Sequence, residues 1–222
     1  MDQYTKMIVK KRIEKTIAAL EKNNMMGIYV ERREDAPAKV AELIEEGATV
    51  AFGGSMTLNE CGVMEHLRSG RYHLLDRDNC PPEEKDAVQR QAFSADVFLC
   101  SSNAITENGE LYNVDGMGNR TAALIFGPKS VIVVAGYNKL CKDVEKASVR
   151  VKSIAAPANC ERLDCRTYCK EKGECAAFAS GNRYMTSGCA SEGRICSTYV
   201  VSAYQKIKNR IKVILVGEEL GY

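Results

Sequence analysis

The chain has 222 residues, and its 31 Lys and Arg residues against 29 Asp and Glu residues give a formal net charge of +2. This length fits one substantial α/β domain with a small appendage rather than two full domains, and so balanced a charge argues against nucleic acid or an anionic membrane as a partner. No apolar run approaches the roughly 18 residues that span a bilayer and the start is polar, so we expect a cytoplasmic protein.

The first hundred residues alternate between predicted helices and predicted strands. Helical spacing of apolar residues and capping residues predict helices at residues 2–24, 35–46, 55–69 and 81–94. Short apolar runs between them predict buried strands at residues 25–30, 48–52, 72–75 and 97–101. This alternation is typical of a parallel sheet that helices cover on both faces.

A glycine turn follows the strand at residues 48–52, in the stretch V-A-F-G-G-S-M-T-L-N-E-C-G that begins at Val50. Paired glycines let the backbone turn sharply and approach a ligand, while Ser55 and Thr57 can cap the next helix and leave free N–H groups facing an anion. The stretch therefore predicts a phosphate or carboxylate pocket. A tight turn with a good N-cap would explain the same residues without a ligand.

A second polar loop, residues 101–120, follows the strand at 97–101. Loops beyond the carboxyl ends of parallel strands bind ligands, so we expect both loops to line one crevice. The candidate ligand-binding residues are Gly53, Gly54, Ser55, Thr57, Asn103, Thr106, Asn113, Gly116, Asn119 and Arg120. The candidates for a catalytic base or nucleophile are Glu60, Glu107 and Asp115. Turn capping and solvation also account for carboxylates in such loops.

The second half of the chain changes character. Apolar runs at residues 122–126 and 131–135 flank Gly127 and predict a hairpin or short return strand, and Pro157 is expected to end a helix that begins near residue 142. Further strands are predicted at residues 199–204 and 210–217. Between them and the helix, residues 160–196 contain six of the ten cysteines. Without a secretion signal, so many cysteines indicate metal or redox chemistry rather than disulfides.

Four motifs carry a resemblance to a known family. In chain order they are G-G-S-M-T-L at 53–58, T-E-N-G-E-L at 106–111 with N-V-D-G-M-G-N-R, A-P-A-N-C-E-R-L at 156–163, and the ending R-I-K-V-I-L-V-G-E-E-L-G-Y. Over nearly its whole length the chain resembles the lactate-utilisation, or LUD-domain, family. The resemblance implies a single α/β domain over residues 1–222, with a three-layer, parallel-sheet fold of the ribose-phosphate isomerase, glucosamine-phosphate deaminase and CoA-transferase class.

The cysteines resemble a family pattern, T-P-C-x5-C-x2-C-x6-C. It assigns Cys169, Cys175, Cys189 and Cys196 as ligands of one metal centre, with Tyr168 in place of the Pro and a longer middle gap. The gaps of five, thirteen and six residues lack the close pairs usual in structural zinc sites, so a [4Fe-4S] cluster is favoured over zinc. The spare thiols nearby, Cys160 and Cys165, could replace a ligand.

These features predict a lactate-utilisation-family protein that binds an iron–sulfur cluster and a small anionic metabolite. The resemblance implies a role in oxidation of lactate or a related hydroxyacid, beside an iron–sulfur redox partner protein. One alternative is an isomerase-like or transferase-like enzyme with structural zinc, and another is a non-catalytic subunit that binds a metabolite. Whether the chain is an enzyme, its substrate and its oligomeric state are left open, a homo-oligomer being one alternative.

Overall fold

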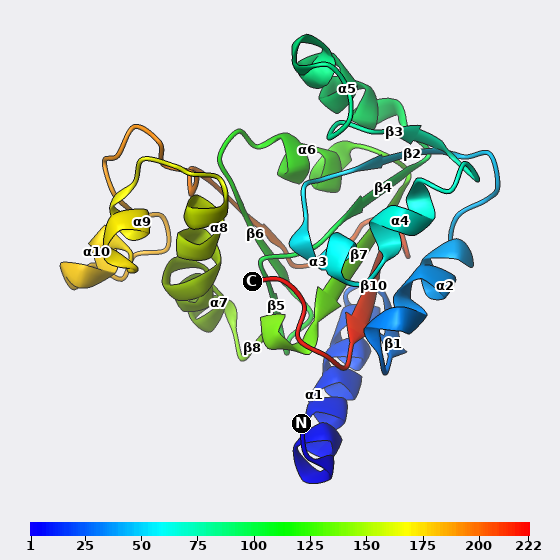
Figure 1. Ribbon diagram of the computed structural model, residues 1–222. Helices are drawn as coiled ribbons and strands as arrows, with labels where there is room; N and C mark the ends of the chain where they lie inside the picture. The colour runs from blue at the N-terminus through cyan, green and yellow to red at the C-terminus, as the bar shows by residue number, and fades with distance from the viewer.

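A central sheet of six parallel strands organises the protein, whose computed structural model describes residues 1–222 (Figure 1). The strand order is β1-β10-β7-β4-β2-β3. The strands are β1 (Met26–Val30), β2 (Thr49–Phe52), β3 (His73–Leu75), β4 (Val97–Cys100), β7 (Ser130–Gly136) and β10 (Ile211–Val216). The α/β class with a parallel sheet, predicted from the alternation of elements, is confirmed.

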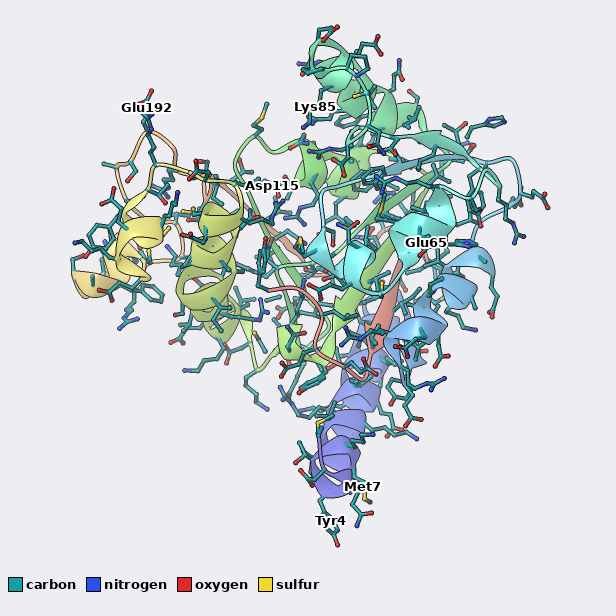
Figure 2. The ribbon with its side chains drawn as sticks, viewed as in Figure 1. Tyr4, Met7, Glu65, Lys85, Asp115 and Glu192 are labelled. Atoms are coloured by element: carbon teal, nitrogen blue, oxygen red, sulfur yellow. The ribbon has the colours of Figure 1, made fainter.

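Helices cover both faces of this sheet, because successive side chains of a strand point to opposite faces. Along β4, Phe98 joins one apolar cluster and Leu99 joins the other. The helices on the Phe98 face are α1 (Gln3–Lys22) and α6 (Asn119–Phe126), and those on the Leu99 face are α2 (Ala36–Ala41), α3 (Met56–Glu60) and α4 (Val63–Leu67). The α1 helix extends beyond the sheet, with Tyr4 and Met7 at its free end (Figure 2).

A second, four-stranded sheet stands beside the first, in the order β8-β5-β6-β9. Its strands are β5 (Ala104–Thr106), β6 (Leu111–Asp115), β8 (Leu140–Cys141) and β9 (Thr198–Ser202). Two of these strands, β5 and β6, pair as an antiparallel hairpin inside the stretch expected to be a polar loop, with Gly109 at positive φ between them. The buried Tyr112 of β6 belongs to the same apolar cluster as Ala147 of α7 (Val144–Arg150), which covers this sheet.

The hairpin predicted around Gly127 is wrong. The apolar residues before it form α6, and β7 pairs in parallel with both β4 and β10. Asp115 accepts a hydrogen bond from the backbone N–H of Thr121 at 2.8 Å and so fixes the first turn of α6. A short apolar run fits a buried helix and a buried strand equally well, which is why periodicity chose wrongly here.

Pro157 does not end the helix that begins at α7. It lies in the first turn of α8 (Ala156–Arg162), directly after the π-helical turn η5 (Val151–Ala155). Proline has no N–H and crowds the carbonyl group four residues before it, and a wider π turn removes this conflict. The helical run therefore continues to Arg162, beside the centre of the molecule.

The remaining helices are short. They are α5 (Lys85–Gln91), α9 (Tyr168–Lys172) and α10 (Ala176–Ala179). The last two belong to the cysteine-rich residues 160–196, which lie to one side of the main body (Figure 1). None of the helices combines the length and apolar character that crossing a membrane requires.

Candidate functional site

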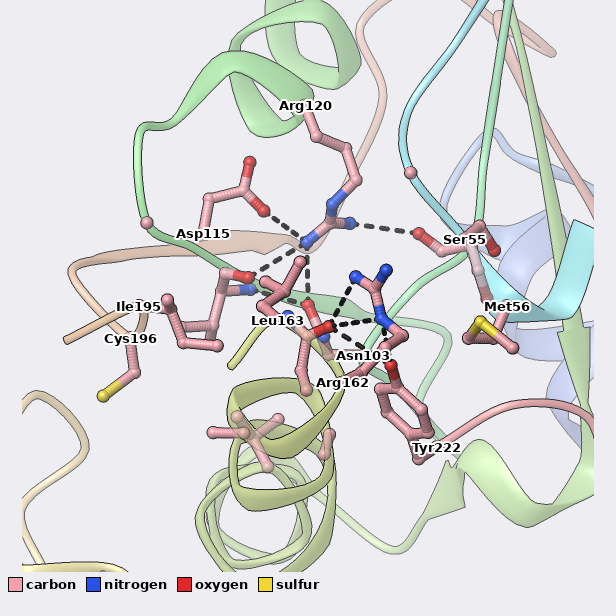
Figure 3. A pocket seen from close by; sticks show the side chains of 18 of the residues that line it. Ser55, Met56, Asn103, Asp115, Arg120, Arg162, Leu163, Ile195, Cys196 and Tyr222 are labelled. Atoms are coloured by element: carbon pink, nitrogen blue, oxygen red, sulfur yellow. Dashed lines mark hydrogen bonds and ion pairs between the residues drawn. The ribbon is translucent and has the colours of Figure 1, made fainter. Parts of the chain in front are cut away.

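A cavity of about 350 Å³ lies where several carboxyl ends of the central strands meet α8 (Figure 3). The wall includes Ser55 after β2, Ser102 after β4 and Lys139 after β7. Tyr222, which follows β10, and Arg162 of α8 close the other side. Ligands of open parallel sheets bind at this end of the strands, and the two polar loops singled out in the sequence do meet here.

Arg120 holds the loops around the cavity together. Its Nη1 donates hydrogen bonds to the Ser101 carbonyl oxygen at 3.0 Å and to Asn113 Oδ1 at 2.6 Å. Its Nη2 donates to Asn103 Oδ1 at 2.8 Å and to Asp115 Oδ1 at 2.6 Å. The Arg120 side chain is only 12% exposed. Because both terminal nitrogens already have acceptors, Arg120 supports the wall rather than offering a free charge to a ligand.

Lys139 is a buried amine in the wall of the same cavity. Its Nζ donates to Thr57 Oγ1 at 2.9 Å and to Ser101 Oγ at 3.0 Å, and the residue is 4% exposed. None of the ion pairs of the structure includes Lys139. Burial, together with the nearby charges of Arg150 and Arg120, lowers the pKa of Lys139 to about 7.

Arg162 stands at the mouth of the cavity with neutral partners only. Its Nη2 donates to Asn159 Oδ1 at 2.7 Å, one helical turn before it, and its Nε donates to the Tyr222 hydroxyl at 2.5 Å (Figure 3). Arg77 also lines the cavity. Its Nε is buried without a hydrogen bond and lies 3.5 Å from the carboxylate of Asp78.

The charge of the lining is strongly unbalanced. Four basic side chains and one carboxylate face the cavity, namely Arg77, Arg120, Lys139, Arg162 and Asp115. Asp115 is already paired with Arg120. Lys139 is buried without a carboxylate, Arg77 has only its 3.5 Å ion pair with Asp78, and Arg162 is exposed with neutral partners. A buried charge is costly without a counter-charge. An anion would supply that counter-charge, so the cavity is complementary to an anionic ligand.

Most of the candidate loop residues lie at or directly behind this cavity. Those in the wall are Gly54, Ser55, Asn103, Asp115, Gly116, Asn119 and Arg120. Behind the wall, Thr57 and Asn113 accept hydrogen bonds from Lys139 and Arg120. Gly53 passes so close to Arg120 that a Cβ there would lie 2.9 Å from Arg120 Cγ.

Glu107 and Thr106, in contrast, lie outside the cavity. Glu107 accepts hydrogen bonds from Arg12 at 3.1 Å and from Lys15 at 3.0 Å, both on α1. Thr106 donates to Glu110 Oε2 at 2.7 Å. The sequence could not anticipate this position, because the β5–β6 hairpin turns the middle of the predicted loop away from the sheet edge. Neither residue lines the cavity.

Glu60 also lies outside the cavity, at the exposed end of α3. Its Oε2 accepts a hydrogen bond from the Gly221 backbone N–H at 2.7 Å, so it anchors the chain after β10. With Glu107 held by α1 and Asp115 held by Arg120, none of the three candidate carboxylates stands free at the cavity.

Cys169, Cys175, Cys189 and Cys196, the four cysteines predicted as metal ligands, are not gathered into one site. No group of three or more His, Cys, Asp or Glu side chains in the structure is placed to hold a metal ion. Cys169 Sγ instead lies 3.5 Å from Sγ of Cys160, which the pattern left outside the set. As placed, these residues do not fit a four-cysteine cluster.

A lysine occupies the inner side of the cysteine-rich segment. The ammonium group of Lys152 donates to the carbonyl oxygen of Ser187 and lies 5.8 Å from the ring centre of Phe178 and 5.6 Å from that of Tyr199. Such cation–π contacts stabilise a desolvated cation. The buried ammonium group of Lys152 is therefore held by a carbonyl oxygen and two aromatic rings, with Cys175 and Cys196 nearby.

The metal centre and the iron–sulfur partner protein therefore stay predictions of the family resemblance. Iron, acid-labile sulfide and zinc assays on anaerobically purified protein test the first of them. A cluster predicts about four irons per chain, lost in Cys169→Ser and kept in the control Cys61→Ser. Cys61 is buried and lies outside the cysteine-rich residues 160–196. Such a result would require residues 160–196 to rearrange so that four Sγ atoms converge. Absence of bound metal in the wild type and in Cys61→Ser would contradict the prediction.

Comparisons with known proteins give one clear match. A family model described as the LUD domain matches residues 13–216. No curated protein matches the chain. Among solved structures, a DUF162 family protein from Deinococcus radiodurans matches with a TM-score of 0.49 and 14% identity, over 95% of this chain and 98% of that one. The eIF2B beta structure from Chaetomium thermophilum matches with a TM-score of 0.33 and 20% identity, over 50% of this chain and 39% of that one.

Proposed function

The chain belongs to the LUD-domain family, and we propose that it binds a small anionic metabolite in the cavity between the central sheet and α8. The observation that carries this proposal is the unbalanced lining. Lys139, Arg77 and Arg162 face the cavity without a hydrogen-bonded carboxylate, and the one carboxylate there is paired with Arg120.

The size and polarity of the cavity limit the ligand class. A volume of about 350 Å³ is at the lower end of the range for small-molecule sites, which suits an organic acid of a few carbons or its phosphate ester. Membership of the lactate-utilisation family favours a 2-hydroxy or 2-oxo acid within that class. Arg162 can bind a carboxylate through two parallel hydrogen bonds, as guanidinium groups commonly do.

The cavity also offers groups for the rest of such an acid. Ser55, Ser102 and Asn103 provide neutral polar side chains, and Leu163 and Ile195 provide an apolar patch. A few well-placed polar groups among apolar ones orient a small ligand, and here they surround the buried Lys139 amine.

Replacing Arg162 with methionine should weaken binding of lactate, pyruvate and inorganic phosphate by about tenfold or more. A hydrogen bond to a charged group contributes about 1.5–3 kcal/mol, and about 1.4 kcal/mol corresponds to tenfold in affinity. Isothermal titration calorimetry at fixed ionic strength measures the change, with thermal shift as a second readout. The methionine keeps most of the aliphatic stem, so stability should change little.

Arg166→Met is the matched control, since Arg166 is an exposed arginine of the same segment that lies outside the cavity. It should bind these anions as the wild type does. Equal losses in both variants would show a general effect of positive charge rather than a site. If no carboxylate or phosphate stabilises the wild type at millimolar concentration, the proposed function is wrong.

A further inference from the structure

We propose that Lys139 forms a covalent imine with the carbonyl carbon of a 2-oxo acid bound in the cavity. The inference rests on the anion site proposed above and adds a chemical step to it. It assigns a reactive role to a residue that no motif in the sequence singled out.

The first support is the placement of the amine. Lys139 is the only lysine in the cavity wall, and its Nζ is held by the hydroxyl groups of Thr57 and Ser101. Two fixed hydrogen bonds restrict the side chain to one orientation, which removes much of the entropy that a free lysine loses on reaction. Lysine amines that react with carbonyl groups are typically held in such water-poor pockets.

The second support is the absence of a partner that would keep the amine protonated. No carboxylate pairs with Lys139, and the nearby cations Arg150 and Arg120 lower its pKa more than the carboxylate of Glu60 raises it. Only an unprotonated amine attacks a carbonyl carbon. With a pKa of about 7, a large part of Lys139 is unprotonated at neutral pH, whereas an ordinary lysine with a pKa near 10.4 is almost wholly protonated.

The third support concerns the ligand. A 2-oxo acid carries its carboxylate next to the carbonyl carbon, so cations that hold the carboxylate also hold the carbonyl group within the cavity. Arg162 and Arg77 are the cations available for the carboxylate. An iminium group formed at Lys139 would again place a positive charge beside that carboxylate, which stabilises the product without any further counter-ion.

The step is balanced without an oxidant or a cofactor. The Lys139 nitrogen forms a bond to the carbonyl carbon, the carbonyl π electrons move to oxygen, and a proton passes from nitrogen to that oxygen to give a carbinolamine. The hydroxyl group then leaves as water together with the remaining proton of the nitrogen, and the C=N bond of the imine forms. The Ser101 hydroxyl, 3.0 Å from Nζ, is placed to pass the proton. Hydrolysis reverses the step and returns the free amine.

Trapping with a hydride donor tests the proposal. The full-length protein is incubated with pyruvate and sodium cyanoborohydride, which reduces an imine to a stable secondary amine, and the product is examined by intact-mass and peptide mass spectrometry. The expected result is one adduct per chain, on Lys139. Lactate has the same carboxylate but no carbonyl group, so it should give no adduct and should protect Lys139 from pyruvate when present in excess.

Variants and pH complete the test. Lys139→Met and Lys139→Arg should give no adduct while keeping native circular dichroism, and Lys146→Met, which removes an exposed lysine outside the cavity, should give the wild-type amount. The initial rate of trapping should rise with pH and reach half of its maximum value near pH 7. A midpoint above about pH 9, as for an ordinary lysine, or adducts spread evenly over surface lysines would overturn the proposal.

The outcomes separate this inference from the proposed function. If pyruvate and lactate both stabilise the wild type but no adduct appears on Lys139, the anion site stands and the imine is wrong. If neither acid stabilises the protein, the anion site itself is wrong.

Discussion

Replacing Arg120 with methionine is expected to lower the free energy of unfolding by about 3–5 kcal/mol, the usual cost of removing one partner of a buried ion pair. The carboxylate of Asp115, only 7% exposed, would lose its counter-charge, and the side-chain oxygens of Asn103 and Asn113 would lose a donor. Urea unfolding followed by circular dichroism measures the change. Ligand binding should fall as well, because the same contacts hold both loops at the cavity.

Arg90 supplies the control for that prediction. It forms an ion pair with Asp86 at 2.8 Å, but the two side chains are 76% and 66% exposed, so Arg90→Met should cost less than about 1 kcal/mol. The double variant Arg120→Met, Asp115→Asn should recover part of the loss, because the buried charge is then removed together with its partner. Equal destabilisation by Arg90→Met and Arg120→Met would show that the buried Arg120 network contributes no more to stability than an exposed ion pair does.

Replacing Lys139 with methionine is expected to raise the free energy of unfolding by about 1–4 kcal/mol at pH 7 while abolishing the binding response to 2-oxo acids. A methionine of similar length removes the cost of a buried cation, and such replacements of buried charges are often stabilising. A gain in stability with a loss of function distinguishes a functional residue from a structural one.

The pH dependence of stability gives a second readout for the same variant. Between pH 7 and about pH 10.5 the unfolded chain keeps a proton on Lys139 that the folded chain has released. Unfolding therefore takes up this proton, and the contribution of Lys139 makes the wild type more stable as pH rises through this window. Lys139→Met should lack that rise. If denaturation curves of both proteins change identically from pH 7 to pH 10, the lowered pKa of Lys139 is not real.

Much of the fold could be predicted because the central strands are continuous apolar runs. Val97 to Cys100 is buried on both faces of the sheet, and the strand predicted there differs from β4 by one residue. The location of the site followed from the same fact, since polar loops after such strands meet at one edge. The helix at 119–126 was missed because its apolar run also fits a strand, and only tertiary contacts decide between them.

Lys139, to which we assign the covalent step, could not be found from the sequence. Lys139 sits between Asn138 and Leu140 in no motif, and only the folded chain shows that it is buried beside Thr57 and Ser101. Arg162 left a weaker signal, because it lies three residues after Asn159 in A-P-A-N-C-E-R-L and residues at this spacing share one helix face. The expected helix end at Pro157 concealed that spacing.

The position of β10 has a consequence for how the protein folds. Its residues come late in the sequence, yet β10 lies between β1 and β7 and is the sole sheet neighbour of β1. Until residues 211–216 leave the ribosome, β1 has no strand to pair with and one edge of β7 is open, a condition that invites aggregation. Joining segments so distant in sequence also makes folding slow. Nascent chains that stall before residue 211 should therefore depend on chaperones, even though every residue of β1 has already been made.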